Sequence, residues 1–312
     1  MTIFRSPADV PKSFGPSVVT IGNFDGVHSG HRQIMRQLKP ANLTRVVLTF
    51  DPHPAKVLAP DRAPTLLMTI GQRLRACESE GIEAVLLLPF SLEFAKLTPD
   101  EFVREILVEA LHARLVLVGE DFRFGYKQAG NIETLRALGQ QYGFEVFPIA
   151  PIERRKERIS STGIRKLVSE GAVSRACRML GAPFALEGEV VKGQGIGSKQ
   201  TVPTLNLAPR NETLPKNGVY VTRTRDLDSD RRWPSITNIG YRPTFEGKGL
   251  TIETFLLGPF DGNSPEQIEV EFLAFVRDER KFDTPEDLKK QILKDAGVAA
   301  RLHRHLSNIR MY

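Results

Sequence analysis

The sequence predicts an α/β domain with a parallel sheet, followed by a compact antiparallel β-barrel that ends in a closing helix. Short apolar runs alternate with helical patterns in the first half, whereas short strand-like runs separated by turn signals fill the second half. The length of 312 residues also corresponds to about two domains. Because the pattern changes at Gly181-Ala182-Pro183, we expect domains at residues 1–182 and 183–312.

The first half contains five expected strands, each a short apolar run, at 18–21, 45–50, 84–88, 115–118 and 144–147. Helical patterns lie between them, and the clearest begins at Thr98-Pro99-Asp100-Glu101, where Thr98 and Glu101 form a capping box. Strand–helix alternation is typical of a parallel sheet with right-handed crossovers. Since ligands bind at the carboxyl ends of such strands, functional residues should follow them.

The second half contains a different set of expected strands, at 184–191, 218–223, 235–239, 250–257 and 267–275. Turn signals such as Asn217-Gly218 and Asp261-Gly262 separate them, which favours a barrel. A final helix is expected from residue 285 to about 306, because Leu288, Ile292 and Leu302 recur at roughly helical spacing.

Composition excludes several classes of protein. The net charge is +6, but the basic residues are scattered, which favours an enzyme that handles phosphates over a nucleic-acid-binding protein. No apolar run reaches the roughly 18 residues of a membrane span, and the first residues lack a signal-peptide core. Two cysteines are too few for a disulfide framework or a four-ligand zinc site, so we expect a cytoplasmic protein.

A pair of histidines, His28 and His31, follows the first expected strand at the start of a helical pattern, with Gly30 between them. The two rings share one helix face, and a helix N-terminus attracts anions. Gly30 lets a phosphate approach, and two imidazoles could stabilise charge in phosphate transfer. The spacing alone leaves a metal pair or two surface histidines as alternatives.

Four sequence blocks make the phosphate interpretation more specific. The stretch from Gly22-Asn23-Phe24-Asp25 to Gly30-His31 resembles the nucleotide loop of bacterial bifunctional riboflavin kinase/FAD synthetases. The resemblance continues, in that family's order, at Thr49-Phe50-Asp51-Pro52-His53-Pro54, at Gly119-Glu120-Asp121-Phe122-Arg123-Phe124-Gly125 and at Ser160-Ser161-Thr162 with Ile164 and Arg165.

The resemblance implies a Rossmann-like FMN adenylyltransferase domain in which His28 and His31 are catalytic. It further implies a set of residues that bind nucleotide and flavin: Gly22, Asn23, Phe24, Asp25, Gly30, Asp51, His53, Asp121, Phe124, Ser160, Ser161, Thr162 and Arg165. From the residues alone, three other interpretations stay open: a proline-rich turn at Asp51, a core phenylalanine pair at Phe124 and an ordinary helix cap at Ser160.

In the second half the resemblance implies a riboflavin kinase barrel. ATP would be bound by a glycine loop with Gly193, Gly195, Gly197 and Lys199, although Ser198 stands where the family usually has arginine. Mg²⁺ would be held by the oxygens of Thr204 and Asn206, which are the hard ligands this ion prefers. Glu253 would be the general base, and a solvent-facing strand glutamate is its alternative.

The resemblance therefore implies conversion of riboflavin to FMN and then FAD, with ATP and Mg²⁺, and with no nucleic-acid, membrane or obligate protein partner. One alternative keeps only the adenylyltransferase and makes the barrel a flavin-binding or structural module. Another is a flavin-responsive nucleic-acid regulator, which the isoelectric point of 9.3 suggests.

Overall fold

The computed structural model describes all residues except 39–41, 151–152, 155–156, 192–203, 245–246, 259, 261–262, 281 and 309–312. The chain divides into two compact units. The first comprises Met1–Thr65 and Ile70–Ser160, and the second comprises Leu66–Thr69 and Ser161–Tyr312. Within the described part of the chain, no helix is long and apolar enough to cross a membrane.

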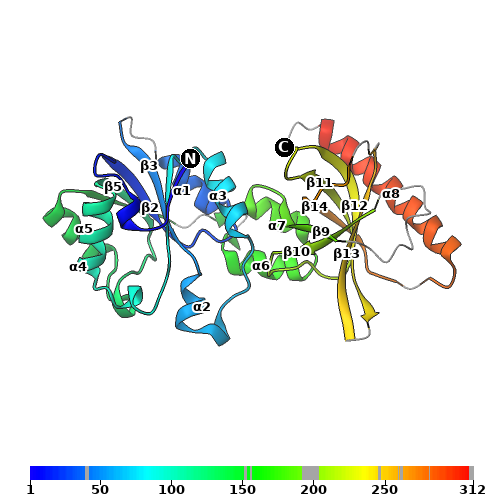
Figure 1. The fold of residues 1–312 in the computed structure, drawn as a ribbon, viewed down its shortest axis with the longest axis horizontal. Helices are drawn as coiled ribbons and strands as arrows, with labels where there is room; N and C mark the ends of the chain where they lie inside the picture. Colours follow the sequence, from blue (N-terminus) through cyan, green and yellow to red (C-terminus); the bar gives the residue numbers. More distant parts are fainter. Residues whose placement is uncertain are drawn as a thin grey trace. The chain divides into compact units, whose positions relative to one another are not determined.

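The first unit contains a six-stranded parallel sheet in the order β1-β4-β3-β2-β5-β6. Strands β2, β3 and β5 of this sheet are labelled in Figure 1. Its strands are β1 (Thr2–Phe4), β2 (Ser17–Ile21), β3 (Thr44–Phe50), β4 (Ala84–Leu88), β5 (Ala113–Gly119) and β6 (Glu145–Ile149). The five strands expected from the apolar runs are confirmed. The structure adds β1, which at three residues is too short to give a periodic signal.

Helices connect these strands: α1 (Ser29–Gln37), α2 (Pro54–Leu58), α3 (Ile70–Ser79), α4 (Pro99–Phe102), a π-helix η4 (Val103–Ala110) and α5 (Ile132–Tyr142). Short 3-10 turns lie at η1 (Pro7–Asp9), η2 (Pro60–Arg62), η3 (Phe94–Lys96) and η5 (Tyr126–Gln128), and a small hairpin pairs β7 (Glu153–Arg154) with β8 (Glu157–Arg158). The expected capping box is present, since the Glu101 N–H donates to Thr98 Oγ1 at 3.2 Å.

The second unit contains a closed antiparallel barrel in the order β10-β13-β12-β11-β14-β9. Its elements are α6 (Ser161–Ser169), α7 (Val173–Leu180), β9 (Phe184–Val191), β10 (Thr204–Pro209), β11 (Gly218–Asp226), β12 (Arg232–Thr244), β13 (Gly247–Leu256), β14 (Gln267–Arg277) and α8 (Pro285–Asn308). The barrel and its closing helix are therefore confirmed.

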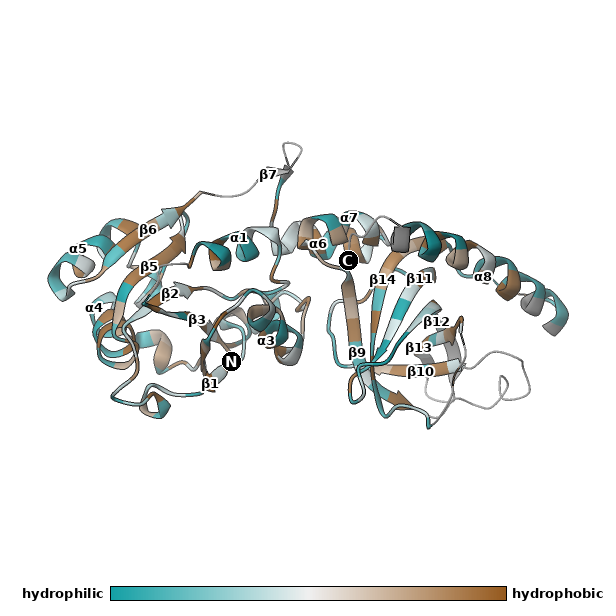
Figure 2. Ribbon diagram, turned by 90° about the horizontal axis from the view of Figure 1, so that it is seen from above, coloured by the Kyte–Doolittle hydropathy of each residue, from teal (hydrophilic) through white to brown (hydrophobic). Residues whose placement is uncertain are grey.

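The two faces of the barrel strands differ in chemistry. Buried hydroxyls of Thr222, Thr237 and Thr254 turn inward and form hydrogen bonds of 2.8 and 2.9 Å. The outward face carries Val219 and Ile236, which pack with Ala299 of α8. In Figure 2, α8 carries both apolar and polar residues along its length, as expected of a helix with one face on a barrel.

Helices α6 and α7 belong to the second unit, although the sequence pattern suggested a boundary after residue 182. The buried face of α7 contacts β14, where the Ser174 hydroxyl donates to the Leu273 carbonyl at 2.7 Å. The Cys177 thiol lies 3.2 Å from the Phe272 carbonyl. The sequence pattern changes near residue 182, where α7 ends and β9 begins. The two units of the structure instead divide after Ser160.

Candidate active sites

The two histidines lie together at the start of α1. His28 is the N-cap residue, and its Nδ1 accepts a hydrogen bond from the His31 N–H at 3.3 Å. The rings are stacked, with centroids 3.6 Å apart and planes 14° from parallel. The spacing of three residues between the two histidines therefore predicted correctly that their rings lie together. The helix begins at Ser29, between the two histidines.

Both imidazoles are neutral near pH 7. Burial lowers the pKa of His28 to about 4. Burial, followed by the charges of His28 and Arg32, holds the pKa of His31 well below its ordinary value. Because Nδ1 of His28 accepts a hydrogen bond, its proton is on Nε2, which is then a neutral donor. Nδ1 of His31 is buried and has no hydrogen-bond partner within the described residues.

A pH titration of the ligand-free protein tests this charge state. We expect the ring resonances of His28, assigned by their loss in His28→Asn, to titrate near pH 4. Because the folded-state pKa is lowered, the unfolded state takes up a proton first, so the free energy of unfolding should fall as the pH drops from about 6.5 toward about 4. A titration midpoint near 6.5 would contradict a buried neutral ring.

Two glycines and one phenylalanine with a left-handed backbone conformation surround the histidine pair. A Cβ on Gly30 would lie 3.0 Å from Cε1 and Nδ1 of His28, so a side chain there would displace the ring. Phe24 is buried with a φ of 49°, in the left-handed region, and its ring is edge-on to His31 at 5.1 Å. A Cβ on Gly22 would lie 3.2 Å from the Phe24 ring. Gly30 thus leaves room for the His28 ring, and Gly22 leaves room for the Phe24 ring that packs on His31.

Arg73 of α3 is a site residue that the sequence reasoning missed. Its Nη1 donates to the Asn23 carbonyl at 2.9 Å, to Thr49 Oγ1 at 3.0 Å and to the Phe50 carbonyl at 3.1 Å. Burial lowers the pKa of Arg73, while the charges of Asp25 and Asp51 act in the opposite direction. One buried guanidinium therefore ties together the carboxyl ends of β2 and β3. Nothing in the sequence distinguishes Arg73 from a surface helix cation.

Asp51 and His53 follow β3, as expected. Asp51 is exposed, and its N–H donates to the Leu88 carbonyl at 3.0 Å. His53 is the N-cap residue of α2, and its Nδ1 accepts from the Ala55 N–H at 3.1 Å. Both residues lie on the edge of the sheet to which Arg73 binds, so Asp51 contributes negative charge near that cation.

The block after β5 separates into an exposed and a buried part. Asp121 is exposed and forms an ion pair with Arg158, with N and O 2.5 Å apart. Phe124 is buried in the core against Phe102, with its ring stacked on Phe122 at 5.4 Å. The buried ring of Phe124 contributes to packing, and the half-buried Phe122 has more surface for a ligand.

The Ser160-Ser161-Thr162 block lies at the point where the chain passes between the two units. Ser160 ends the first unit, whereas Ser161, Thr162 and Arg165 are in α6 of the second. Ile164, with Leu167 and Val168, is buried, which confirms the expected apolar face of this helix. Thr162 is exposed at the first turn.

The predicted kinase residues lie on adjacent strands of the barrel. Asn206 of β10 is directly opposite Glu253 of β13, and Glu253 is opposite Asn238 of β12. Thr204 lies two residues before Asn206 and so shares its face. Side chains paired in this way have Cβ atoms about 5 Å apart. Glu253 is half-buried between two asparagines, unlike a fully solvated strand glutamate.

A cavity of about 560 Å³ adjoins Thr204 and Asn206. Its other lining residues come from the end of β9 and from the chain before β14: Glu189, Val190, Val191, Leu205, Ser264, Pro265, Glu266 and Gln267. The expected ATP loop, with Gly193, Gly195, Gly197 and Lys199, lies outside the described residues.

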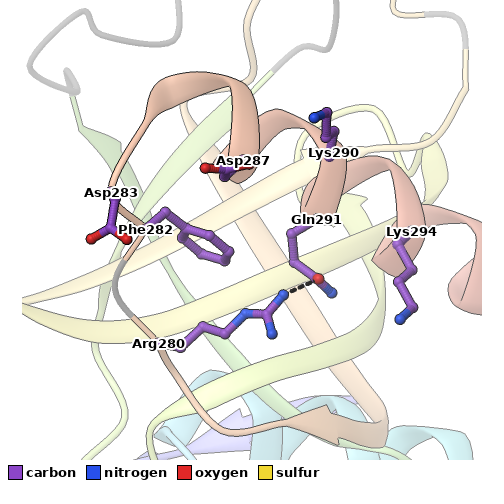
Figure 3. A pocket seen from close by; sticks show the side chains of 7 residues that line it. All are labelled: Arg280, Phe282, Asp283, Asp287, Lys290, Gln291 and Lys294. Atoms are coloured by element: carbon purple, nitrogen blue, oxygen red, sulfur yellow. Dashed lines mark hydrogen bonds between the residues drawn. The ribbon is translucent and has the colours of Figure 1, made fainter.

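A second cavity of the same unit, about 430 Å³, lies at the start of α8 (Figure 3). It is lined by Arg280, Phe282, Asp283, Asp287, Lys290, Gln291 and Lys294. The Arg280 guanidinium stands over the Phe282 ring at 4.9 Å and donates to Gln291 Oε1. The lining of this cavity thus includes three basic side chains, two acidic side chains and one aromatic ring.

Both halves of the chain match known families. Residues 10–163 match FAD synthetase, and residues 180–303 match riboflavin kinase. The chain is 33% identical to the bifunctional riboflavin kinase/FMN adenylyltransferase of Buchnera aphidicola from Schizaphis graminum, over 96% of this chain and 98% of that protein. It is 35% identical to the Escherichia coli K12 protein of the same name, over 90% and 91%.

A solved structure shares the whole fold. A protein from Streptococcus pneumoniae, described as a macrolide-efflux protein, superposes with a TM-score of 0.84 and 30% identity, covering 96% of this chain and 98% of that one. Together with the two-site geometry, these relationships show that the chain belongs to the family of bifunctional riboflavin kinase/FMN adenylyltransferases, which convert riboflavin to FMN and FMN to FAD.

Proposed function

We propose that FMN is adenylylated at His28 and His31 in the first unit and that riboflavin is phosphorylated at Thr204, Asn206 and Glu253 in the second. One observation supports this assignment: the expected catalytic residues form two clusters, one within each unit. The assignment of the two activities to residues 1–182 and 183–312 is part of this proposal.

In adenylylation, an FMN phosphate oxygen attacks the α-phosphorus of ATP, and the bond to the β-phosphate bridging oxygen breaks to release pyrophosphate. No nucleophile from the protein is required. The Nε2–H of His28 is a buried neutral donor that would bind a non-bridging phosphate oxygen as negative charge develops there. Gly30 keeps the space beside that ring open. The protein thus positions the reacting phosphates and supplies fixed hydrogen-bond donors.

In phosphorylation, the terminal ribityl hydroxyl of riboflavin attacks the γ-phosphorus of ATP, and ADP leaves. The Glu253 carboxylate would accept the hydroxyl proton as the new O–P bond forms. Its position opposite Asn206 supports this role, because Asn206 lines the cavity and Glu253 is its direct neighbour on the paired strand.

Mg²⁺ would be held by the hydroxyl oxygen of Thr204 and the amide oxygen of Asn206, on one face of β10. Oxygen ligands of this kind fit Mg²⁺, which takes its remaining ligands from water and nucleotide phosphates. Among the described residues, no cluster of three or more His, Cys, Asp or Glu side chains could hold a metal. When bound, Mg²⁺ would neutralise charge on the phosphates.

Replacing Asn206 with alanine tests the metal assignment. We expect the Mg²⁺ concentration needed for half-maximal riboflavin phosphorylation to rise by about tenfold or more, the usual scale for loss of a metal-site group. Adenylylation of supplied FMN should not change. Ala208→Ser is the matched control, because Ala208 is exposed on the same strand and does not line the cavity. An unchanged Mg²⁺ requirement in Asn206→Ala would refute the assignment.

The cytoplasmic location, and the expected lack of nucleic-acid, membrane and obligate protein partners, stay predictions from the sequence.

A further inference from the structure

Arg73 of α3 is a buried cation of the first unit, with 3% of its surface exposed. Burial of a charged group is costly unless hydrogen bonds and nearby opposite charges compensate for the loss of water. The Nε of Arg73 is also buried, and it has no hydrogen-bond partner within the described residues. The hydrogen bonds that fix this cation in the described structure come from Nη1.

Nη1 of Arg73 joins the chain just after β2 to the end of β3. It donates to the Asn23 carbonyl at 2.9 Å on one side and to the Phe50 carbonyl at 3.1 Å on the other. Thr49 closes the cluster, because its buried hydroxyl accepts from Nη1 at 3.0 Å and lies 3.3 Å from the Asn23 carbonyl, to which it donates. Arg73 and Thr49 therefore hold two segments together that are neighbours only through the sheet.

The first of these segments leads to the histidine pair. Asn23 directly precedes Phe24, whose ring is buried and lies edge-on to His31, with centroids 5.1 Å apart. Phe24 has a φ of 49°, a backbone conformation that non-glycine residues keep only where surrounding contacts maintain it. The hydrogen bond from Arg73 to the preceding residue is such a contact. It connects Arg73 to His31 through Asn23 and Phe24.

The second segment leads to Asp51. The Phe50 carbonyl that accepts from Arg73 belongs to the peptide group that joins Phe50 to Asp51. The negative charges of Asp51 and of Asp25, which is buried, favour the charged form of Arg73 and oppose the effect of burial on its pKa. The guanidinium thus fixes the backbone before one of these carboxylates and offsets the charge of both.

Helix α3 is itself attached to the histidine helix. Just after α3, the Glu80 carboxylate accepts from Arg32 Nη1 at 2.7 Å and from Arg36 Nε at 2.6 Å, and its side chain is largely buried. Both arginines are in α1, which carries His31. Since α3 is bound to α1 at this end, the place of Arg73 is fixed relative to the histidines.

We propose that Arg73 is a positioning residue for FMN adenylylation, which holds residues 23–25 and the end of β3 in the geometry that the histidine pair requires. The inference rests on the proposed adenylyltransferase site, and every group it uses belongs to the first unit. Arg73 acts through its neighbours and takes no part in bond making. The effect is large because a misplacement of about 1 Å in such a site can lower a rate by about 10²-fold.

Arg73→Met in the full-length protein is the first test, because methionine keeps a long side chain and suits a helix but has no N–H donor. We expect the kcat of FMN adenylylation to fall by about 10- to 10²-fold, with a smaller change in the KM for ATP. Riboflavin phosphorylation by the same preparation should stay within about twofold of wild type. Arg73→Lys keeps the charge and an N–H donor and should recover most of the lost rate.

Thr49→Val removes one partner of Nη1 and keeps the shape of the side chain. It should lower the same kcat by about three- to tenfold, the scale of one hydrogen bond, and it still reports if Arg73→Met does not fold. The double variant should be no slower than Arg73→Met, because both act through one cluster. Arg136→Met is the matched control: Arg136 is an exposed arginine of α5 in the same unit, and its loss should change neither activity.

A structural readout tests the positioning without any assay of activity. The nuclear Overhauser effect between ring protons of Phe24 and His31 should be clear in the wild-type protein, weaken in Arg73→Met and persist in Arg73→Lys. Folding of each variant is followed by circular dichroism, and rates are measured well below its melting transition.

An undiminished adenylylation rate in folded Arg73→Met overturns the proposal. So do equal losses in Arg73→Met and Arg73→Lys, additive effects of Arg73→Met and Thr49→Val, or a fallen rate with an unchanged contact between the Phe24 and His31 rings. A His28→Ala/His31→Ala protein is assayed beside these variants. If it keeps adenylylation, the site assignment itself fails, whereas the ring contact still shows whether Arg73 holds the loop before α1.

Discussion

Replacement of both His28 and His31 by alanine is expected to slow formation of FAD from FMN by roughly 10²-fold or more, the scale of losing a transition-state hydrogen-bond donor. Burial lowers the pKa of both stacked rings at the start of α1, so we expect them to act as neutral hydrogen-bond donors rather than as cations. The measurement is the steady-state rate of FAD production from supplied FMN and ATP. Phosphorylation of riboflavin by the same protein should change little.

Gln33→Ala is the matched control for the histidine pair. Gln33 is in the same helix but exposed, so its loss should leave both activities near wild type. If the double histidine variant is folded and makes FAD at a near-normal rate, the adenylyltransferase site is elsewhere.

The second large effect is expected for Glu253→Gln, which keeps the shape of the side chain but removes the proton-accepting charge. If Glu253 is the base, riboflavin kinase turnover should fall by about 10²–10⁴-fold, the usual range for general acid–base catalysis. Riboflavin binding should weaken little, because the amide can still hydrogen-bond a hydroxyl. Adenylylation of supplied FMN should not change, and both activities are measured on the same preparation.

Glu170→Gln is the control for this variant. Glu170 is an exposed glutamate of the same unit that does not line the cavity, and it pairs with Lys166 at 4.0 Å, so we expect its loss to have little effect on turnover. A folded Glu253→Gln protein with undiminished kinase turnover would mean that another group accepts the proton.

Much of the fold was predictable because its signals are local. The apolar runs at β2, β3 and β4 and the capping box at Thr98 depend on neighbouring residues in the chain. The three-residue β1 was missed because its pairing with β4 depends on residues about eighty positions away. The grouping of α6 and α7 with the barrel also depends on long-range contacts, such as that of Ser174 with Leu273.

The candidate sites show the same limit. The pairing of His28 with His31 follows from helical spacing, and the shared face of Thr204 and Asn206 follows from strand spacing. The register that puts Asn206 opposite Glu253 required the structure. Arg73 left no local signal, because its contacts are with strand ends that are distant from it in the chain.

The central claim is that one chain holds two chemically separate active sites, and product analysis tests it most directly. Each of the two variants, His28→Ala/His31→Ala and Glu253→Gln, is incubated with riboflavin, ATP and Mg²⁺, and riboflavin, FMN and FAD are separated over time. We predict that the histidine variant accumulates FMN without FAD. We predict that the Glu253→Gln variant leaves riboflavin unconverted yet makes FAD when FMN is supplied. Loss of both steps in either folded variant, or of neither step in both, would contradict two separate sites.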